Sequence, residues 1–428
     1  MRRLLVCVGM ISLCACAGDA LPEDEVMAAW QVERSTDGDV TTVRNLAGSK
    51  WGGQAVLVEE LSIGVLEGDE EYMLGRVSTV AVSEEFVFVA DSQPALIKVY
   101  DRASGEFVRT VGGEGEGPGE YVFPSVMRVV GDELFVQDGG NGRIQVFSTD
   151  GEYRRQLRLD ALGFLGGFVV AADGRAYMQS MLFLDDEGQQ LPADEQRWGF
   201  HEVDDEGTVG DPFYAPGVDM DRSEFVMRSS DGRFGATVPY APGVPNGIST
   251  APAVVDGWNG TYAFNIHYPD GRRVSVDRHW TPVPISSAER ESLKAQTIAR
   301  VRRRAPDWEW TGPEVPETKP AYASIIPDHG SLIMIVRHVA SERGDDCVEK
   351  PTTEDFEAGA TMCWQTRYTW DFFDHDGNYL GEVVRPNVRI MGWPYIRDDT
   401  FGLAVDDDDG AVRVKVYRRR LPSDGRDS

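Results

Sequence analysis

The fold is decided by the stretch EFVFVADSQPALIKVYDRASGEFVRTVG, residues 85–112, because it returns as ELFVQDGGNGRIQVFSTDGEYRRQL in residues 133–157. Asp91 and Asp138 stand 47 residues apart, as do several matching apolar positions. Each copy alternates short apolar strands with Asp/Gly turns, which is typical of antiparallel strands joined by hairpins. A period in the forties with about four strands per unit indicates the blades of a β-propeller.

The third strand of this unit can be followed, with its turn, along the chain. Five copies end in a glycine turn: IKVYDRASG, IQVFSTDG, WGFHEVDDEG, FNIHYPDG and WDFFDHDG, which end at Gly105, Gly151, Gly207, Gly271 and Gly377. A sixth copy, VRVKVYRRR from Val412, has no fourth strand after it. Six third strands predict six blades in one domain. The missing strand is expected from AVLVEELSIGVLEG, residues 55–68, because a ring closed in this way leaves no sheet edge exposed.

Residues 111–125, VGGEGEGPGEYVFPS, raise the question of a phosphate-binding loop. Such a loop surrounds the anion with backbone N–H groups and adds a lysine or a helix N-terminus. This stretch carries Glu114, Glu116 and Glu120, has no lysine, and continues into extended chain. We therefore expect its glycines to connect the outer strand of one blade to the inner strand of the next.

The segment GEGEGPGEYVFPSVMRVVGDELFVQDGGNGRIQVFSTDGEY resembles an NHL-type repeat. The whole chain is similar to bacterial six-bladed β-propeller lipoproteins of mostly unassigned function. The resemblance is strong over residues 61–157, moderate over residues 370–418, and weak between them, where insertions interrupt the period. Together with the repeat, it predicts an all-β, NHL-like, six-bladed propeller closed by an N-terminal strand.

The first residues, MRRLLVCVGMISLCACAGDA, have the form of an export signal. Two arginines precede an apolar run that is too short to span a bilayer, and LCAC resembles a lipobox in which Cys16 becomes the lipidated N-terminus. A plain signal peptide cut nearby is the alternative. We expect a lipoprotein signal peptide over residues 1–15 and a protein anchored by lipid alone in a bacterial cell envelope, at the periplasmic or surface face of the outer membrane.

The remaining chain is expected to contain three parts and two insertions. The parts are a tether with an outer hairpin (16–53), the propeller (54–420) and a tail (421–428). The insertions are a helix over about residues 286–305 and a cysteine-bounded segment over about residues 341–364.

Local signals support both insertions. Ser286 precedes Glu289 by three residues, which is the spacing of a capping box at a helix start. Cys347 and Cys363 remain once the signal and the lipid site are set aside, and in an oxidising compartment they are expected to form a disulfide. Two free thiols or half of a metal site would be the alternative, but no CxxC motif or nearby histidine cluster accompanies them.

Acidic residues outnumber basic ones by 71 to 42, and the formal net charge is −29. Nucleic acid is therefore not expected as a partner, because phosphate contacts need a cationic surface. A surface of this kind would suit cationic ligands or divalent ions.

Metal and catalytic motifs are weak. The six histidines form no HxH or HExxH pair. VDDDDGAVRVKVY echoes part of a calcium loop at Asp406, Asp408 and Gly410, but it lacks the distal glutamate, and Asp-Gly between two strands favours a hairpin turn. No GxSxG elbow occurs. We therefore expect no catalytic residue, no metal site and no cofactor, with calcium as a weak possibility.

Residues near the predicted starts of inner strands are the best candidates for ligand contacts. They are Arg76, Tyr121, Ser125, Trp393 and Tyr395. The function expected from these observations is a binding or scaffold module for an unknown small molecule, peptide or envelope protein. The alternatives are a propeller enzyme, either a metal-dependent lactonase or hydrolase or an amidating-lyase-like protein, and a purely structural role in the envelope.

Overall fold

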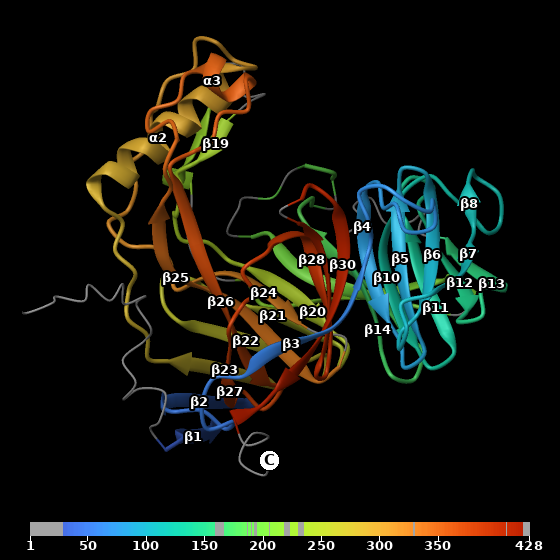
Figure 1. The fold of residues 1–428 in the computed structure, drawn as a ribbon. Coiled ribbons are helices and arrows are strands. Elements are labelled where there is room, and N and C mark those ends of the chain that lie inside the picture. The colour runs from blue at the N-terminus through green and yellow to red at the C-terminus, as the bar shows by residue number, and fades with distance from the viewer. Residues whose placement is uncertain are drawn as a thin grey trace, which may run out of the picture.

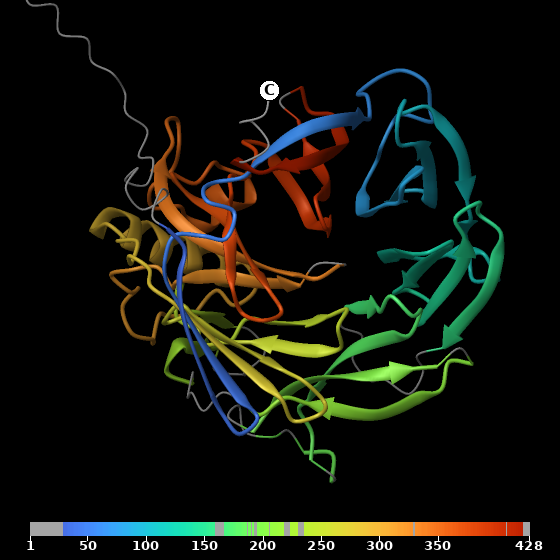
Figure 2. The same cartoon turned by 90° about the horizontal axis from the view of Figure 1, so that it is seen from below.

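A computed structural model describes residues 29–422, except 159–166, 186, 190, 192–194, 205, 218–222, 230–234, 328–329 and 408. Six blades, each with four antiparallel strands, are arranged around a central axis, as Figure 2 shows from below. No helix in the described part of the chain is long and apolar enough to cross a membrane.

The first three blades follow the sequence without interruption of strand order. Blade one contains β4 (Val77–Val82), β5 (Phe86–Ser92), β6 (Ala95–Asp101) and β7 (Phe107–Val111). Blade two contains β10 (Pro124–Val130), β11 (Glu133–Asp138), β12 (Arg143–Ser148) and β13 (Tyr153–Arg158). Blade three contains β14 (Phe168–Val170), β15 (Ala176–Leu182), β16 (Arg197–Val203) and β17 (Val209–Tyr214).

The last three blades include the closure of the ring. Blade four contains β20 (Asn246–Ser249), β21 (Ala253–Asp256), β22 (Ala263–His267) and β23 (Arg273–Arg278). Blade five contains β24 (Tyr322–Pro327), β25 (Leu332–Arg343), β26 (Trp364–Asp374) and β27 (Tyr379–Val383). Blade six contains β28 (Arg389–Arg397), β29 (Thr400–Asp406) and β30 (Val412–Arg420), and its fourth strand is β3 (Val56–Ile63).

This arrangement confirms the predicted fold. The six third strands are β6, β12, β16, β22, β26 and β30, which contain the six copies found in the sequence. β3 pairs antiparallel with β30 from Val56 opposite Arg420 to Ile63 opposite Val414, so an N-terminal strand closes the last blade.

The hydrophobic core lies between neighbouring blades. In β5, Phe88, Val89 and Ala90 are consecutive and all fully buried, because both faces of the blade are covered by its neighbours. A strand buried on both faces reads as a continuous apolar run. The run EFVFVA in the repeat therefore indicates a strand in a blade whose two faces are covered by neighbouring blades.

The 47-residue repeat is visible in the hydrogen bonds. Asp91, at the end of β5, accepts bonds from the backbone N–H groups of Gly75 (2.7 Å) and Arg76 (2.8 Å). Asp138, at the end of β11, accepts them from Val122 (3.1 Å) and Phe123 (3.0 Å). In both blades the second strand thus fixes the loop that leads into the first strand.

The glycine-rich stretch lies where it was predicted, between β7 and β10. It contains two short parallel strands, β8 (Gly113–Glu114) and β9 (Glu120–Tyr121). The backbone N–H of Gly117 donates to the Glu120 carboxylate at 2.8 Å, so an acidic side chain of the loop itself binds one of its amides.

An N-terminal hairpin extends blade four. β1 (Gln31–Asp37) pairs with β2 (Val40–Ala47), and β2 runs parallel to β23. Asn45 anchors the hairpin to blade five, because its side chain donates to Gly377 O and accepts from Tyr379 N. The hairpin is therefore part of the packed ring.

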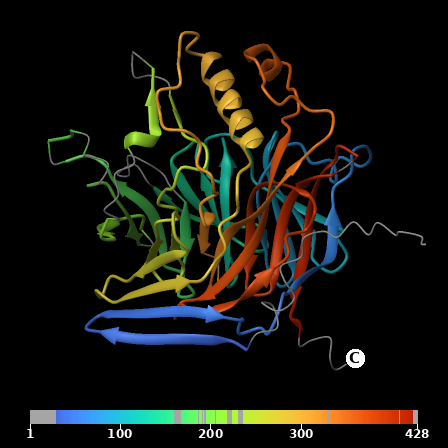
Figure 3. The same ribbon diagram turned by 90° about the vertical axis from the view of Figure 1, so that its left-hand side faces the viewer.

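A lobe rises from the ring on the side opposite to this hairpin (Figures 1 and 3). We define the lobe as residues 223–229, 235–241, 285–315 and 341–364, the last of which contains the connection from β25 to β26. It contains α2 (Ser287–Arg302), α3 (Thr353–Glu357), η1 (Ser223–Phe225), β18 (Val226–Arg228) and β19 (Gly235–Thr237). Its small core includes Met227, Val301 and Trp308.

Both predicted insertions belong to the lobe. Ser286 Oγ caps α2 by accepting from Glu289 N at 3.2 Å. The Glu289 carboxylate does not complete the expected capping box; it is buried and accepts from Lys319 Nζ (3.0 Å) and Ser341 Oγ (2.6 Å). The predicted disulfide between Cys347 and Cys363 is confirmed, with Cα atoms 4.8 Å apart.

Candidate functional site

A cavity of about 640 Å³ lies at the centre of the ring. Its wall is built from the inner strands of all six blades, β4, β10, β14, β20, β24 and β28, together with residues of the adjoining strands β11 and β15. Most lining positions fall in the first half of these inner strands. The cavity, which we call the channel site, is therefore assembled from segments spread over the whole sequence.

The lining mixes polar and aromatic side chains. Hydroxyl groups come from Ser78, Thr79, Ser125 and Ser324; amides from Gln137, Gln179 and Asn246; aromatic rings from Phe168, Trp393 and Tyr395; and a guanidinium from Arg128. Among the described lining residues there is no carboxylate, imidazole or thiol. The chain has 71 acidic residues, so a wall without a described carboxylate differs in composition from the chain as a whole.

Several polar groups of the wall are held by one another. Gln179 Nε2, from blade three, donates to Asn246 Oδ1, from blade four, at 2.9 Å. Ser125 Oγ donates to the carbonyl oxygen of Gln137 at 3.3 Å. These bonds fix the side chains in place and leave further donor and acceptor capacity on the amides.

Arg128 is the one charged side chain of the described lining. Its Nη1 donates to Met127 O at 2.8 Å, and its guanidinium carbon lies 5.4 Å from the centre of the Phe168 ring. Its Nε is buried and has no hydrogen-bond partner among the described residues. Burial lowers the pKa of Arg128 to about 10, which leaves the group cationic at neutral pH.

Three of the five predicted contact residues meet at this site. Ser125, Trp393 and Tyr395 all line the cavity. The Trp393 side chain is 72% exposed, the largest value among the exposed large hydrophobic residues described. Tyr395 is buried, and its hydroxyl donates to Val82 O at 2.8 Å.

The other predicted residues lie elsewhere. Arg76 is exposed in the loop before β4 and is not part of the lining. Tyr121 is fully buried, with its ring 5.9 Å from that of Phe147, also outside the lining. Cys16 lies outside the described residues.

Sequence reasoning missed Arg128 and the three amides. A signal for Arg128 was present, because it interrupts the apolar run VMRVV of an inner strand. For the amides, no signal distinguished them from ordinary polar residues of a strand.

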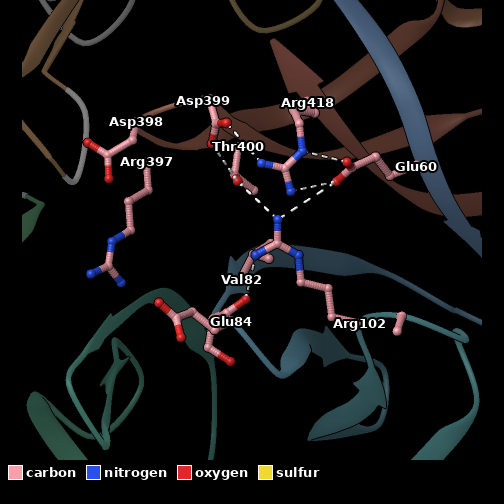
Figure 4. A pocket seen from close by; sticks show the side chains of 11 residues that line it. Glu60, Val82, Glu84, Arg102, Arg397, Asp398, Asp399, Thr400 and Arg418 are labelled. Carbon is pink, nitrogen blue, oxygen red and sulfur yellow. Dashed lines mark hydrogen bonds and ion pairs between the residues drawn. The ribbon is translucent and has the colours of Figure 1, made fainter. Parts of the chain in front are cut away.

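A second cavity, also of about 640 Å³, lies at the seam between blades one and six (Figure 4). Four of its seven charged side chains form ion pairs: Glu60, Arg102, Asp399 and Arg418. Arg418 bonds to Glu60 (2.5 Å) and Asp399 (2.9 Å), and Arg102 donates to Thr400 Oγ1 at 3.1 Å. Glu60 lies on β3, at the irregularity in the β3–β30 pairing between Glu59 and Leu61. Because its contacts join the closing strand to its neighbours, we interpret the seam cavity as part of ring closure.

The candidate calcium loop forms the β29–β30 hairpin turn. Gly410 N donates to Asp407 O at 2.8 Å, and Asp409 pairs with Arg413. Within the described part of the chain, no group of three or more histidine, cysteine or acidic side chains is placed to hold a metal ion.

A family model agrees with this architecture. Residues 37–162 match a family model described as a 6-bladed beta-propeller. The fold is a six-bladed β-propeller. A member of the duf4221 family from Bacteroides vulgatus is 10% identical, with 86% of this chain and 99% of that chain covered and a TM-score of 0.48. A candidate exported protein from Bacteroides fragilis is 11% identical, with 86% and 95% covered and a TM-score of 0.45.

One curated relative is an enzyme by name. Peptidylglycine alpha-amidating monooxygenase from Rattus norvegicus is 30% identical to this propeller over 181 residues, which is 39% of this chain. The match covers 17% of the length of that relative.

Proposed function

We propose that this propeller is a lipid-anchored, extracytoplasmic binding module that holds a small ligand in the channel site. The observation that carries the proposal is the convergence of the inner strands of all six blades on one cavity with a mixed polar and aromatic wall. Its size of about 640 Å³ falls within the range of small-molecule sites, which is about 300–1,000 Å³.

Trp393 supports a binding role. An indole that is 72% exposed contributes little to the stability of the free protein, because most of its apolar surface stays in water. The same ring offers a flat surface to a ligand, and aromatic rings supply much of the binding energy in such sites. The side-chain amides of Gln179 and Asn246, which are held by the hydrogen bond between them, would orient the ligand.

The extracytoplasmic location rests on two features of the chain. The export signal with its lipobox at Cys16 indicates transport and anchoring, and the disulfide Cys347–Cys363 is the kind of bond that persists in an oxidising compartment. Cys16→Ser should release the protein from the membrane fraction or trap the precursor, as measured by fractionation and lipid labelling. Unchanged labelling would contradict the anchor.

Catalysis is the second candidate, because the relative matched over 181 residues is named as a monooxygenase. The described wall of the channel site offers hydroxyls, amides and a guanidinium. General acid–base chemistry and zinc binding mostly use imidazole, carboxylate or thiolate groups, and the described wall has none of these. We therefore favour binding. Elemental analysis of protein purified without chelator tests the alternative, since a stoichiometric metal would support an enzyme.

A blocked channel tests the binding proposal. Ser125→Trp places a large side chain on the wall, and Ser35→Trp places the same side chain on an exposed position of β1. A small-molecule extract of the native envelope should raise the melting temperature of the wild type and Ser35→Trp, and leave Ser125→Trp unchanged. An equal rise in all three would contradict binding in the channel site, provided that circular dichroism shows each variant folded.

A further inference from the structure

The charges of the channel site differ from those of the rest of the molecule. The chain carries a formal net charge of −29, yet the described wall contains one cation and no carboxylate. A site for a cation or a divalent metal would need the opposite composition. The charge of the described wall is therefore opposite in sign to the net charge of the chain.

Arg128 has few partners inside the protein. It lies on β10, where Met127 and Val129 on either side are buried in the core between blades one and two. The guanidinium has five N–H donors, and the hydrogen bonds of the described residues use one of them, from Nη1 to Met127 O. The buried Nε is left without a partner.

Two other arginines of the protein that are buried or partly buried, Arg337 and Arg143, lie against carboxylates. Arg337 donates to Asp371 and to Glu382, each at 2.7 Å. Arg143 lies 3.5 Å from the Asp138 carboxylate. Arg128 makes no ion pair with a described residue. Arg128 is partly buried on the wall of the cavity, and a charge in such a place without a counter-ion favours the binding of an anion from outside.

We infer that the ligand of the channel site is a small organic anion, a carboxylate or phosphate attached to a flat apolar body, and that Arg128 binds its anionic group. This inference rests on the proposed function and names its ligand class. A guanidinium pairs with both oxygen acids through two parallel hydrogen bonds. Trp393 supplies the flat apolar surface for the body of the ligand.

Four naphthalene probes with one ring system and different charges test the inference. They are 2-naphthoate, 2-naphthyl phosphate, neutral 2-naphthamide and cationic 2-naphthylmethylammonium, titrated calorimetrically into the wild-type protein. We expect either or both anions to bind roughly tenfold or more tightly than the amide, and the cation to bind most weakly. The ratio between the carboxylate and the phosphate tells which oxygen acid the site prefers.

Substitutions at Arg128 test whether this side chain causes the preference for anions. Arg128→Gln should bring the affinities of the anions down to that of the amide, and Arg128→Lys should keep part of the preference, because it keeps the charge and loses the planar fork. Arg76→Gln is the matched control, since Arg76 is exposed and outside the lining. It should leave all four affinities unchanged.

A stability measurement separates ligand binding from a structural role of Arg128. If Arg128 serves the ligand, Arg128→Met should melt at the same temperature as the ligand-free wild type or higher, because it removes an uncompensated charge. A clear fall in the melting temperature would assign the side chain to packing on Phe168 and overturn the inference.

The outcomes also distinguish the inference from the proposed function. Equal binding of anions and amide, unaffected by Arg128→Gln, would overturn the anion inference and leave the channel site as a binding site. No binding of either anion up to millimolar concentrations would also overturn the inference. The blocked variant Ser125→Trp tests the proposed function independently.

Discussion

His338 is a buried titratable group outside the channel site, at the base of the lobe. It is 4% exposed, its Nδ1 lies 2.9 Å from Pro320 O, and its ring lies beside those of Tyr240 and Tyr368. Burial, opposed by the hydrogen bond and assisted by the nearby Lys319 cation, lowers the pKa of His338 to about 4.

This pKa predicts an acid-sensitive stability. Between about pH 6.5 and pH 4 the unfolded chain binds a proton at His338 that the folded chain does not, so the free energy of unfolding falls as the pH falls through this window. The loss approaches roughly 3 kcal/mol at its acid end. Urea unfolding at several pH values should show a shallower pH dependence for His338→Asn than for the wild type. Parallel curves would contradict the assignment.

At the same scale, the candidate site was only partly predictable. Ser125, Trp393 and Tyr395 follow from the position of inner strands, because the repeat fixes where these strands begin. The role proposed for Arg128 depends on the absence of a carboxylate from the described wall around it. That wall is formed by residues from six distant segments. No single stretch of sequence contains that information.

At the scale of elements, the glycine-rich connection is tightly constrained. Gly112 has φ +72°, and a Cβ there would lie 2.2 Å from Tyr121 Cε2 and 2.6 Å from Gly119 O. Gly131 also has a positive φ, +58°, but nothing lies within 4 Å of its Cβ position. The two glycines share the backbone conformation and differ in the available space.

The difference between Gly112 and Gly131 predicts that alanine destabilises the protein more at position 112 than at position 131. Gly131→Ala should lower the free energy of unfolding by about 1 kcal/mol, the cost of a left-handed non-glycine residue. Gly112→Ala should lower it by more, roughly 2–4 kcal/mol, because the Tyr121 ring and the β9 turn must also shift. Denaturant unfolding of both variants measures the difference. Equal effects would mean that the connection is not packed as described.

The elements also show why some predictions succeeded. The third strands were found because each blade repeats a local pattern with its own turn. The lobe was not recognised as one unit, because its core joins two segments, within residues 225–241 and 293–315, that are distant in sequence and have no repeat. Glu289 illustrates this: its spacing from Ser286 fits a capping box, but Lys319 and Ser341 provide the partners that bind its carboxylate.

For the whole molecule, ring closure by β3 is the feature that joins the two ends of the propeller. A chain that begins at Asp69 lacks β3, so β30 loses its outer partner and the seam loses Glu60. Ladder hydrogen bonds contribute about 1 kcal/mol each, and apolar burial is lost with them. We expect the melting temperature to fall by more than about 10 °C, with aggregation through the open edge.

The control for this truncation removes residues 17–28, which leaves every described strand in place. It should melt close to the full-length protein. Scanning calorimetry and light scattering measure both effects. A chain beginning at Asp69 that melts like the full-length protein would refute closure by β3.

The central claim is that the closed ring holds one small ligand in its channel, and native mass spectrometry tests it most directly. Protein released in detergent from its own envelope should carry one organic molecule per chain in the wild type and in Ser35→Trp, and none in Ser125→Trp. A ligand-free wild type, or a bound molecule that persists unchanged in Ser125→Trp, would contradict the claim.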